Sequence, residues 1–62
     1  MKNNIKQLRK SLGMRQSDIA QKLGVARQTI VAIENNKYNP TLELAIKLSR
    51  FFKRPVEEIF YL

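Results

Sequence analysis

Two glycines and two prolines divide this 62-residue chain into short segments. Gly13 and Gly24 each follow a run in which apolar side chains recur every three or four residues, the spacing of one helix face. Glycine accepts positive φ and commonly follows the last turn of a helix. Pro40 lies in a polar, turn-forming stretch, and Pro55 interrupts a later helical pattern. These glycine and proline breaks predict a packed bundle of short helices and exclude the long amphipathic helix of a membrane-active peptide.

The spacing of the apolar residues predicts five helices in a single domain. The first helix ends before Gly13, and the other four cover about residues 16–23, 26–35, 41–52 and 56–60. Thr41 is the expected N-cap of the fourth. Only the two ends of the chain are candidates for a small terminal β-ribbon, and neither alternates cleanly between apolar and polar residues. The expected fold class is therefore all-α, with one domain over residues 1–62.

Charge is distributed unevenly along the chain. The formal net charge is +7, from 12 Lys and Arg against five Asp and Glu. Residues 1–42 hold eight of the basic side chains and two of the acidic ones, whereas residues 43–62 are nearly balanced. This excess predicts a polyanionic partner for the first two-thirds, with simple solubility as the alternative. The chain has no Cys and no His, so we expect no disulfide, no thiolate or imidazole metal site, no cofactor and no Ser-His or Cys-His catalytic pair.

Residues 16–35 carry the most specific pattern, that of two helices meeting at a tight corner. Ala20 is small where the helices cross, and Gly24 supplies positive φ for the turn. Apolar residues take the inward positions and polar residues the outward ones. The inward positions are Ile19, Leu23, Val25, Ile30 and Ile33. An ordinary helical hairpin would explain this packing, but it would not explain the polar start of the second helix.

That second helix, over about residues 26–35, begins with Arg27-Gln28-Thr29. Arginine donates two hydrogen bonds to guanine O6 and N7, and glutamine pairs with adenine N6 and N7 in the major groove. Val31 and Ala32 follow on the same face and suit a thymine methyl group. Because recognition helices present their N-terminal residues to base edges, we expect these five residues to read DNA bases.

The segment Met14-Arg15-Gln16-Ser17-Asp18-Ile19-Ala20-Gln21-Lys22-Leu23-Gly24-Val25-Ala26-Arg27-Gln28-Thr29-Ile30, followed by Ile33-Glu34-Asn35, resembles the phage-repressor-like (Cro/C1 or XRE) helix-turn-helix DNA-binding domains. The resemblance extends over essentially the whole chain. It implies a five-helix phage-repressor-like fold, operator binding and a two-fold dimer.

The resemblance also implies residue roles. Gln16 falls where relatives clamp a phosphate and brace the first base-reading residue. Arg27, Gln28 and Ala32 fall on base-reading positions, and Thr29 reaches a base or a phosphate. DNA-backbone contacts are implied or expected at Arg15, Gln16, Ser17, Asn35, Asn36, Lys37 and Tyr38. Two departures stand out: Ala26 replaces the usual Ser or Thr helix cap, and Ala32 is shorter than the polar side chain of some relatives.

Arg9 and Glu34 match a pair that forms a largely buried salt bridge between the first and third helices of related domains. We expect the same structural ion pair here. The alternative is that both side chains are solvated and that Arg9 binds phosphate. If the pair is buried, removal of one partner costs about 3–5 kcal/mol.

The fourth helix is apolar over roughly 220° of its circumference, more than one core needs. Leu42, Ala45, Leu48 and Phe52 suffice to cover the first three helices, while Leu44 and Phe51 point elsewhere. We therefore expect a dimerisation region over about residues 42–62. Its predicted interface residues are Leu44, Phe51, Val56, Ile59 and Tyr61. In the alternative, the C-terminal segment covers this patch and the protein is monomeric.

These expectations describe a sequence-specific regulator of transcription, most simply a repressor. It would bind a pseudo-palindromic double-stranded DNA operator as a homodimer. An antitoxin or restriction-control subunit of the same fold is the alternative. No apolar run exceeds four residues, so we expect no membrane partner, and the short chain leaves no room for a small-molecule effector pocket. We expect a cytoplasmic, non-enzymatic protein.

Overall fold

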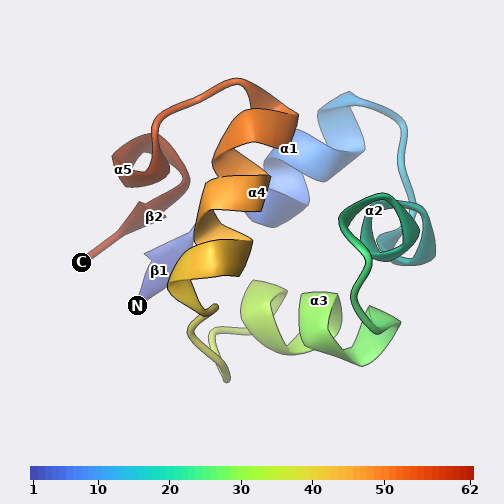
Figure 1. The fold of residues 1–62 in the computed structure, drawn as a ribbon, viewed down its shortest axis with the longest axis horizontal. Coiled ribbons are helices and arrows are strands. Elements are labelled where there is room, and N and C mark those ends of the chain that lie inside the picture. The colour runs from blue at the N-terminus through green and yellow to red at the C-terminus, as the bar shows by residue number, and fades with distance from the viewer.

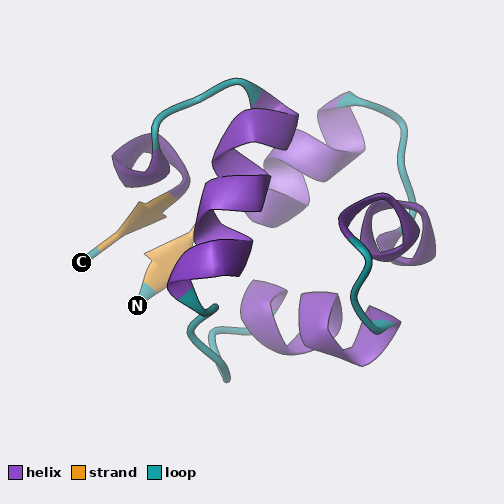
Figure 2. Ribbon diagram, in the orientation of Figure 1, coloured by secondary structure: helices purple, strands orange, loops and turns teal.

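Five helices and a two-stranded ribbon make up the computed structural model, which describes all residues 1–62. The elements are β1 (Lys2–Asn3), α1 (Ile5–Ser11), α2 (Gln16–Leu23), α3 (Arg27–Glu34), α4 (Leu42–Phe52), α5 (Val56–Ile59) and β2 (Phe60–Tyr61). α4 lies across the middle of the molecule, with α2 and α3 to one side and below it and α5 on the other side (Figure 1). Helix dominates the fold, and the small ribbon joins the chain ends (Figure 2). The predicted all-α, five-helix fold is confirmed.

Helix ends follow the turn residues that the sequence indicated. Gly13 and Gly24 have φ angles of 68° and 70°, and their N–H groups donate back to carbonyls of α1 and α2. Thr41 caps α4, because its Oγ1 accepts a hydrogen bond from Leu44 N at 3.2 Å. Ala26 precedes α3 without a side-chain cap, as its missing hydroxyl requires. The chain thus changes direction where local chemistry permits it.

The core draws side chains from all five helices. Its fully buried members are Ile5, Ile19, Ile30, Ile33, Leu48 and Ile59. Branched aliphatic side chains of this size fill the space between short helices and remove apolar area from water. Each helix therefore depends on packing against the others, since segments of 4–11 residues are too short to be stable alone.

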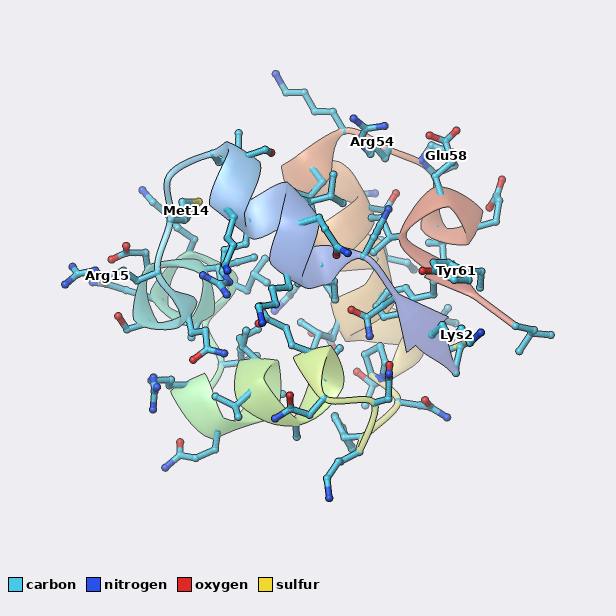
Figure 3. The ribbon with its side chains drawn as sticks, turned by 180° about the vertical axis from the view of Figure 1, so that it is seen from behind. Lys2, Met14, Arg15, Arg54, Glu58 and Tyr61 are labelled. Carbon is cyan, nitrogen blue, oxygen red and sulfur yellow. The ribbon has the colours of Figure 1, made fainter.

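The two chain ends pair as an antiparallel ribbon, with Lys2 opposite Tyr61 and Asn3 opposite Phe60. Figure 3 shows Lys2 and Tyr61 side by side, seen from behind. Phe60 is buried, which anchors β2 to the core. Each strand has only two residues, which is too short for the alternation of apolar and polar residues to be recognised in the sequence.

α4 turns a different face to the core from the one predicted. Leu44, expected to point away, is buried, whereas Leu42, expected inward, is 77% exposed. Ile59, a predicted interface residue, is also fully buried. The prediction that Leu44 and Ile59 supply an exposed dimer surface is therefore wrong. α4 packs against α2 and α5 at once, so its broad apolar arc contained more than one possible inward face.

The other three predicted interface residues differ in exposure. Phe51 and Val56 are half-buried against the core, and Tyr61 is exposed. The ring of Phe51 meets that of Phe52 edge-on at 5.2 Å between centroids. Ile46 joins Leu42 as an exposed apolar side chain of α4. No helix has both the length and the apolar character needed to cross a bilayer.

Candidate nucleic-acid interface

The α2–α3 corner is built as the sequence predicted. Ala20 is buried where the two helices meet, and Gly24 ends α2 in the left-handed conformation. Val25 N donates to Ala20 O at 3.0 Å, which closes the turn. Only Val25 and Ala26 separate Gly24 from the first residue of α3, so α2 fixes the position and direction of α3.

α3 presents its first residues outward. Arg27 and Gln28 are exposed, whereas Ile30 and Ile33 are wholly buried beneath them. At 100° per residue, Arg27, Gln28, Val31 and Ala32 share one face of the helix. Val31 and Ala32 are half-buried on that face. The arrangement leaves two long polar side chains at the N-terminal end, followed by a small apolar surface.

Thr29 lies on the other edge of α3. It is half-buried and lines an open groove together with Tyr38 and Lys47. It is therefore separated from the face that holds Arg27 and Gln28. Of the five predicted base-reading residues, the structure brings four together and places Thr29 at the margin.

A buried ion pair joins α1 to Glu34, the last residue of α3. Arg9 Nε donates to Glu34 Oε2 at 2.8 Å, and Arg9 Nη2 donates to Glu34 Oε1 at 3.1 Å. Both side chains are at least nine-tenths buried. Arg9 Nη1 also donates to Met14 O at 2.8 Å, which ties α1 to the turn before α2. The predicted ion pair is thus present, and hydrogen bonding to Glu34 raises the pKa of Arg9.

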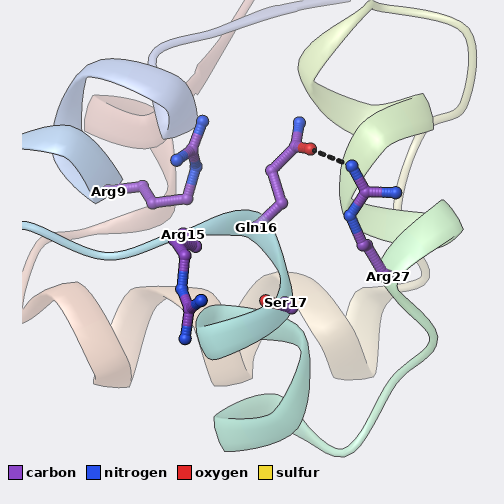
Figure 4. Close-up of a pocket in the computed structure, with 5 residues that line it drawn as sticks. All are labelled: Arg9, Arg15, Gln16, Ser17 and Arg27. Atoms are coloured by element: carbon purple, nitrogen blue, oxygen red, sulfur yellow. Dashed lines mark hydrogen bonds between the residues drawn. The ribbon is translucent and has the colours of Figure 1, made fainter.

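Gln16 extends this buried pair to the surface. Its Nε2 donates to Glu34 Oε1 at 3.2 Å, and its Oε1 accepts from Arg27 Nη2 at 3.1 Å. Figure 4 shows Gln16 between Arg9 and Arg27, with the bond to Arg27 drawn. Because the amide nitrogen is turned toward the carboxylate, the carbonyl oxygen faces the guanidinium. The result is a continuous chain of polar contacts from α1 to the first residue of α3.

A cationic hollow lies at the N-terminal end of α2. It has a volume of about 450 Å³ and no acidic or apolar lining residue. Its lining residues are Arg9, Arg15, Gln16, Ser17 and Arg27. Arg9 and Arg15 are paired with Glu34 and Asp18, whereas Arg27 has no carboxylate partner. The Arg27 guanidinium, the Ser17 hydroxyl and the N-terminus of α2 favour an anion. Such a hollow is suited to a phosphate group.

Arg15, on the outer edge of this hollow, points away from the body of the domain (Figure 3). Its Nε donates to Asp18 Oδ2 at 3.2 Å, and its backbone N donates to the same oxygen at 2.9 Å. These two hydrogen bonds from Arg15 hold the pKa of the Asp18 carboxyl below its ordinary value. Asp18 thus caps the first turn of α2 while Arg15 remains exposed.

The loop after α3 supplies further exposed polar groups. Asn35, Asn36, Lys37 and Tyr38 are all exposed. Asn36 has a φ of 59°, and the turn around it closes α3. Sequence reasoning did not single out Asn3, which hydrogen-bonds to this turn from β1. No local signal marks that contact, because its partners lie 30 and 33 residues away.

A helix-turn-helix family model matches residues 5–59 of the chain. The chain belongs to the Cro/C1-type (XRE) helix-turn-helix family. This Cro/C1-type domain is 52% identical over 60 residues to an uncharacterised HTH-type transcriptional regulator of Methanocaldococcus jannaschii, covering 97% of the present chain and 91% of the relative. It is 42% identical over 62 residues to the HTH-type regulator YgzD of Bacillus subtilis, covering 100% and 94%.

A more distant relative is the cryptic phage CTXphi transcriptional repressor RstR of Vibrio cholerae. It is 32% identical over 57 residues, which are 92% of this chain and 51% of the repressor. Because the chain belongs to this family and its relatives are named as transcriptional regulators, it is a DNA-binding transcriptional regulator. Its Cro/C1-type corner is the part that carries the exposed α3.

Proposed function

We propose that the protein is a sequence-specific repressor that binds a pseudo-palindromic operator as a homodimer. The observation that carries this proposal is the exposed start of α3, with Arg27 fixed by Gln16 and Gln28 free beside it. A helix of this kind fits the major groove, where it presents its first residues to base edges. Arg27 suits a guanine, Gln28 an adenine, and Val31 and Ala32 suit a thymine methyl. Thr29, at the margin, contacts a base or a phosphate.

Phosphate contacts on both sides of α3 set its register. At one end, Arg15, Gln16 and Ser17 of the cationic hollow receive a phosphate. At the other end, the exposed loop Asn35–Tyr38 meets the sugar-phosphate backbone, with Lys37 as its cation. Such contacts position the helix and supply most of the salt-dependent affinity, whereas base contacts supply specificity.

The dimer forms through α4 and the C-terminal end. Leu42 and Ile46 lie one turn apart on the outer face of α4 and are 77% and 41% exposed; we call this pair the α4 stripe. Tyr61 is exposed on the ribbon and belongs to the same interface. Exposed apolar side chains at helical spacing favour association with a second copy. Residues 43–62 carry almost no net charge, so two copies meet there without strong repulsion.

Dimerisation makes the short α3 useful. One recognition helix contacts only a few base pairs, so two copies, about one DNA turn (~34 Å) apart, are needed for specific affinity. A two-fold dimer matches a two-fold operator. Occupancy of that operator then blocks transcription, which agrees with the repressor role stated for the Vibrio cholerae relative.

Selection of bound fragments from a random DNA pool tests the proposal. We expect the enriched sequences to contain two inverted half-sites with centres about one turn apart. Enrichment of a single asymmetric half-site would contradict the dimer. Recovery of unrelated sequences, with no enrichment over the starting pool, would contradict sequence-specific binding altogether.

A further inference from the structure

Asn3 joins the N-terminal strand to the end of α3. Its Nδ2 donates to Ile33 O at 2.8 Å and to Asn36 Oδ1 at 3.1 Å. Its own Oδ1 accepts from Ile5 N at 3.1 Å. The oxygen is therefore held by the start of α1, so the nitrogen must face α3. A single half-buried side chain contacts the first helix, the third helix and the following loop at once.

The contacted turn is one that needs support. Asn36 N donates to Ile33 O at 3.0 Å and Lys37 N donates to Ala32 O at 2.9 Å, the two bonds of a Schellman end. The turn requires a left-handed residue, and Asn36 fills that place with a φ of 59° although it is not glycine. Asn3 adds a second hydrogen bond to Ile33 O and holds the Asn36 side chain directly.

The bond to Asn36 also decides which end of that amide faces outward. A side-chain amide has one acceptor end and one donor end. Phosphate oxygens only accept hydrogen bonds, so an amide helps to bind DNA when its nitrogen faces the backbone. Because Asn3 engages Oδ1 of Asn36, the Nδ2 group is left as the outward end. The orientation suits a phosphate acceptor.

We propose that Asn3 is a positioning residue for DNA binding, which holds the turn after α3 and orients the Asn36 amide as a phosphate donor. The inference rests on the proposed function, in which the loop Asn35–Tyr38 meets the DNA backbone. It gives the terminal ribbon a role beyond closing the fold. β1 is paired to β2 at the C-terminus, so the ribbon connects the end of α3 with the segment that carries Tyr61.

Asn3→Ala compared with Asn4→Ala tests the proposal. Asn4 is the adjacent residue of the same type, and its Nδ2 donates to Glu58 O at 3.0 Å, away from α3. We expect Asn3→Ala to weaken binding to the selected operator and to unrelated duplex alike, by about 3- to 10-fold, because a phosphate contact carries no sequence information. Asn4→Ala should bind DNA as the unmodified protein does, once unfolding curves have established the folded fraction of both variants. Equal affinities for the two variants would overturn the proposal.

A double-mutant cycle with Asn36→Gly gives a readout that a purely structural role would not move. Glycine keeps the left-handed turn but removes the amide that Asn3 orients. We expect Asn3→Ala to cost little further affinity in the Asn36→Gly protein. Losses that simply multiply would mean that Asn3 and Asn36 act independently, and the proposal would then be wrong.

A measurement on the unmodified protein covers the case in which Asn3→Ala does not fold. Side-chain amide NMR signals are followed while operator DNA is added. We expect the Asn36 Nδ2 protons to shift strongly and those of Asn4 to stay in place. An unmoved Asn36 signal, with clear shifts at Gln28, would overturn the role of Asn3 while leaving the proposed function intact. Absence of shifts at both would count against the proposed function itself.

Discussion

The α2–α3 corner and the α4–α5 region are held together by different means. In the corner, a glycine turn and the contacts among Arg9, Glu34, Gln16 and Arg27 fix a polar surface. In the C-terminal region, apolar packing against several helices decides which face of α4 is exposed. Charge follows the same division, because nearly all of the positive excess lies in residues 1–42. The proposed DNA-binding surface is thus built on directional contacts, whereas the proposed dimer surface consists of the apolar side chains that packing leaves exposed.

The largest effect is expected where the corner depends on buried charge. Glu34→Gln leaves the buried Arg9 guanidinium without its carboxylate, and we expect a loss of about 3–5 kcal/mol in the free energy of unfolding. Glu43→Gln, the matched change in the C-terminal region, breaks an exposed pair with Lys47 at 3.5 Å and should cost at most about 1 kcal/mol. Urea unfolding of both variants checks this difference. Equal midpoints would mean that the buried pair does not stabilise the corner.

The next effect concerns the α4 stripe. Ile46→Glu places a charge in the proposed interface, so we expect monomers in sedimentation and at least about a 100-fold loss of operator affinity as the two half-sites are bound separately. Gln21→Glu introduces the same charge at an exposed position of α2 and should remain dimeric. Persistent dimers of Ile46→Glu would place the interface elsewhere.

Substitution of Lys37 distinguishes contacts with the DNA backbone from contacts with the bases on the proposed DNA-binding surface. Lys37→Ala should weaken binding to all sequences alike and reduce the slope of log affinity against log salt by about 0.9 for each protomer. Lys6→Ala removes another exposed lysine, on α1, and should leave the slope nearly unchanged. A change of base preference in Lys37→Ala would contradict its assignment to the backbone.

The smallest effect concerns the exposed cap of α2. Arg15 lowers the pKa of Asp18, so the stabilising contribution of the carboxylate is present above its unfolded pKa of about 3.9. It is lost as the pH falls through the lower, folded-state pKa. Asp18→Asn should therefore reduce stability slightly at neutral pH and flatten the acid side of the stability profile. Identical acid profiles of the two proteins would contradict this assignment.

The contrast between the two regions also explains what the sequence could predict. Ala20, Gly24 and Thr41 act within a few residues of themselves, so local spacing sufficed to place the corner and the helix ends. The pairing of Arg9 with Glu34 came from the family resemblance, and the structure contains it.

The remaining features depend on distant partners. Leu42 was expected to be buried and Leu44 exposed, and the structure shows the reverse. An apolar arc of roughly 220° contains more than one face that neighbouring helices can cover. The ribbon was too short for its alternation to be seen, and Asn3 meets a turn more than 30 residues later only after the fold has formed. The predicted DNA contacts remain predictions, because they require the duplex.

The central claim is that the exposed start of α3 reads base edges, and Gln28→Ala tests it most directly. The measured quantity is the ratio of affinities for the selected operator and for unrelated duplex. We predict that the substitution lowers this ratio by about 1–3 kcal/mol and relaxes the base preference at one or two positions of each half-site. Gln21→Ala, the same change at an exposed site on α2, should leave the ratio as it is in the unmodified protein. An unaltered ratio for Gln28→Ala would contradict the account.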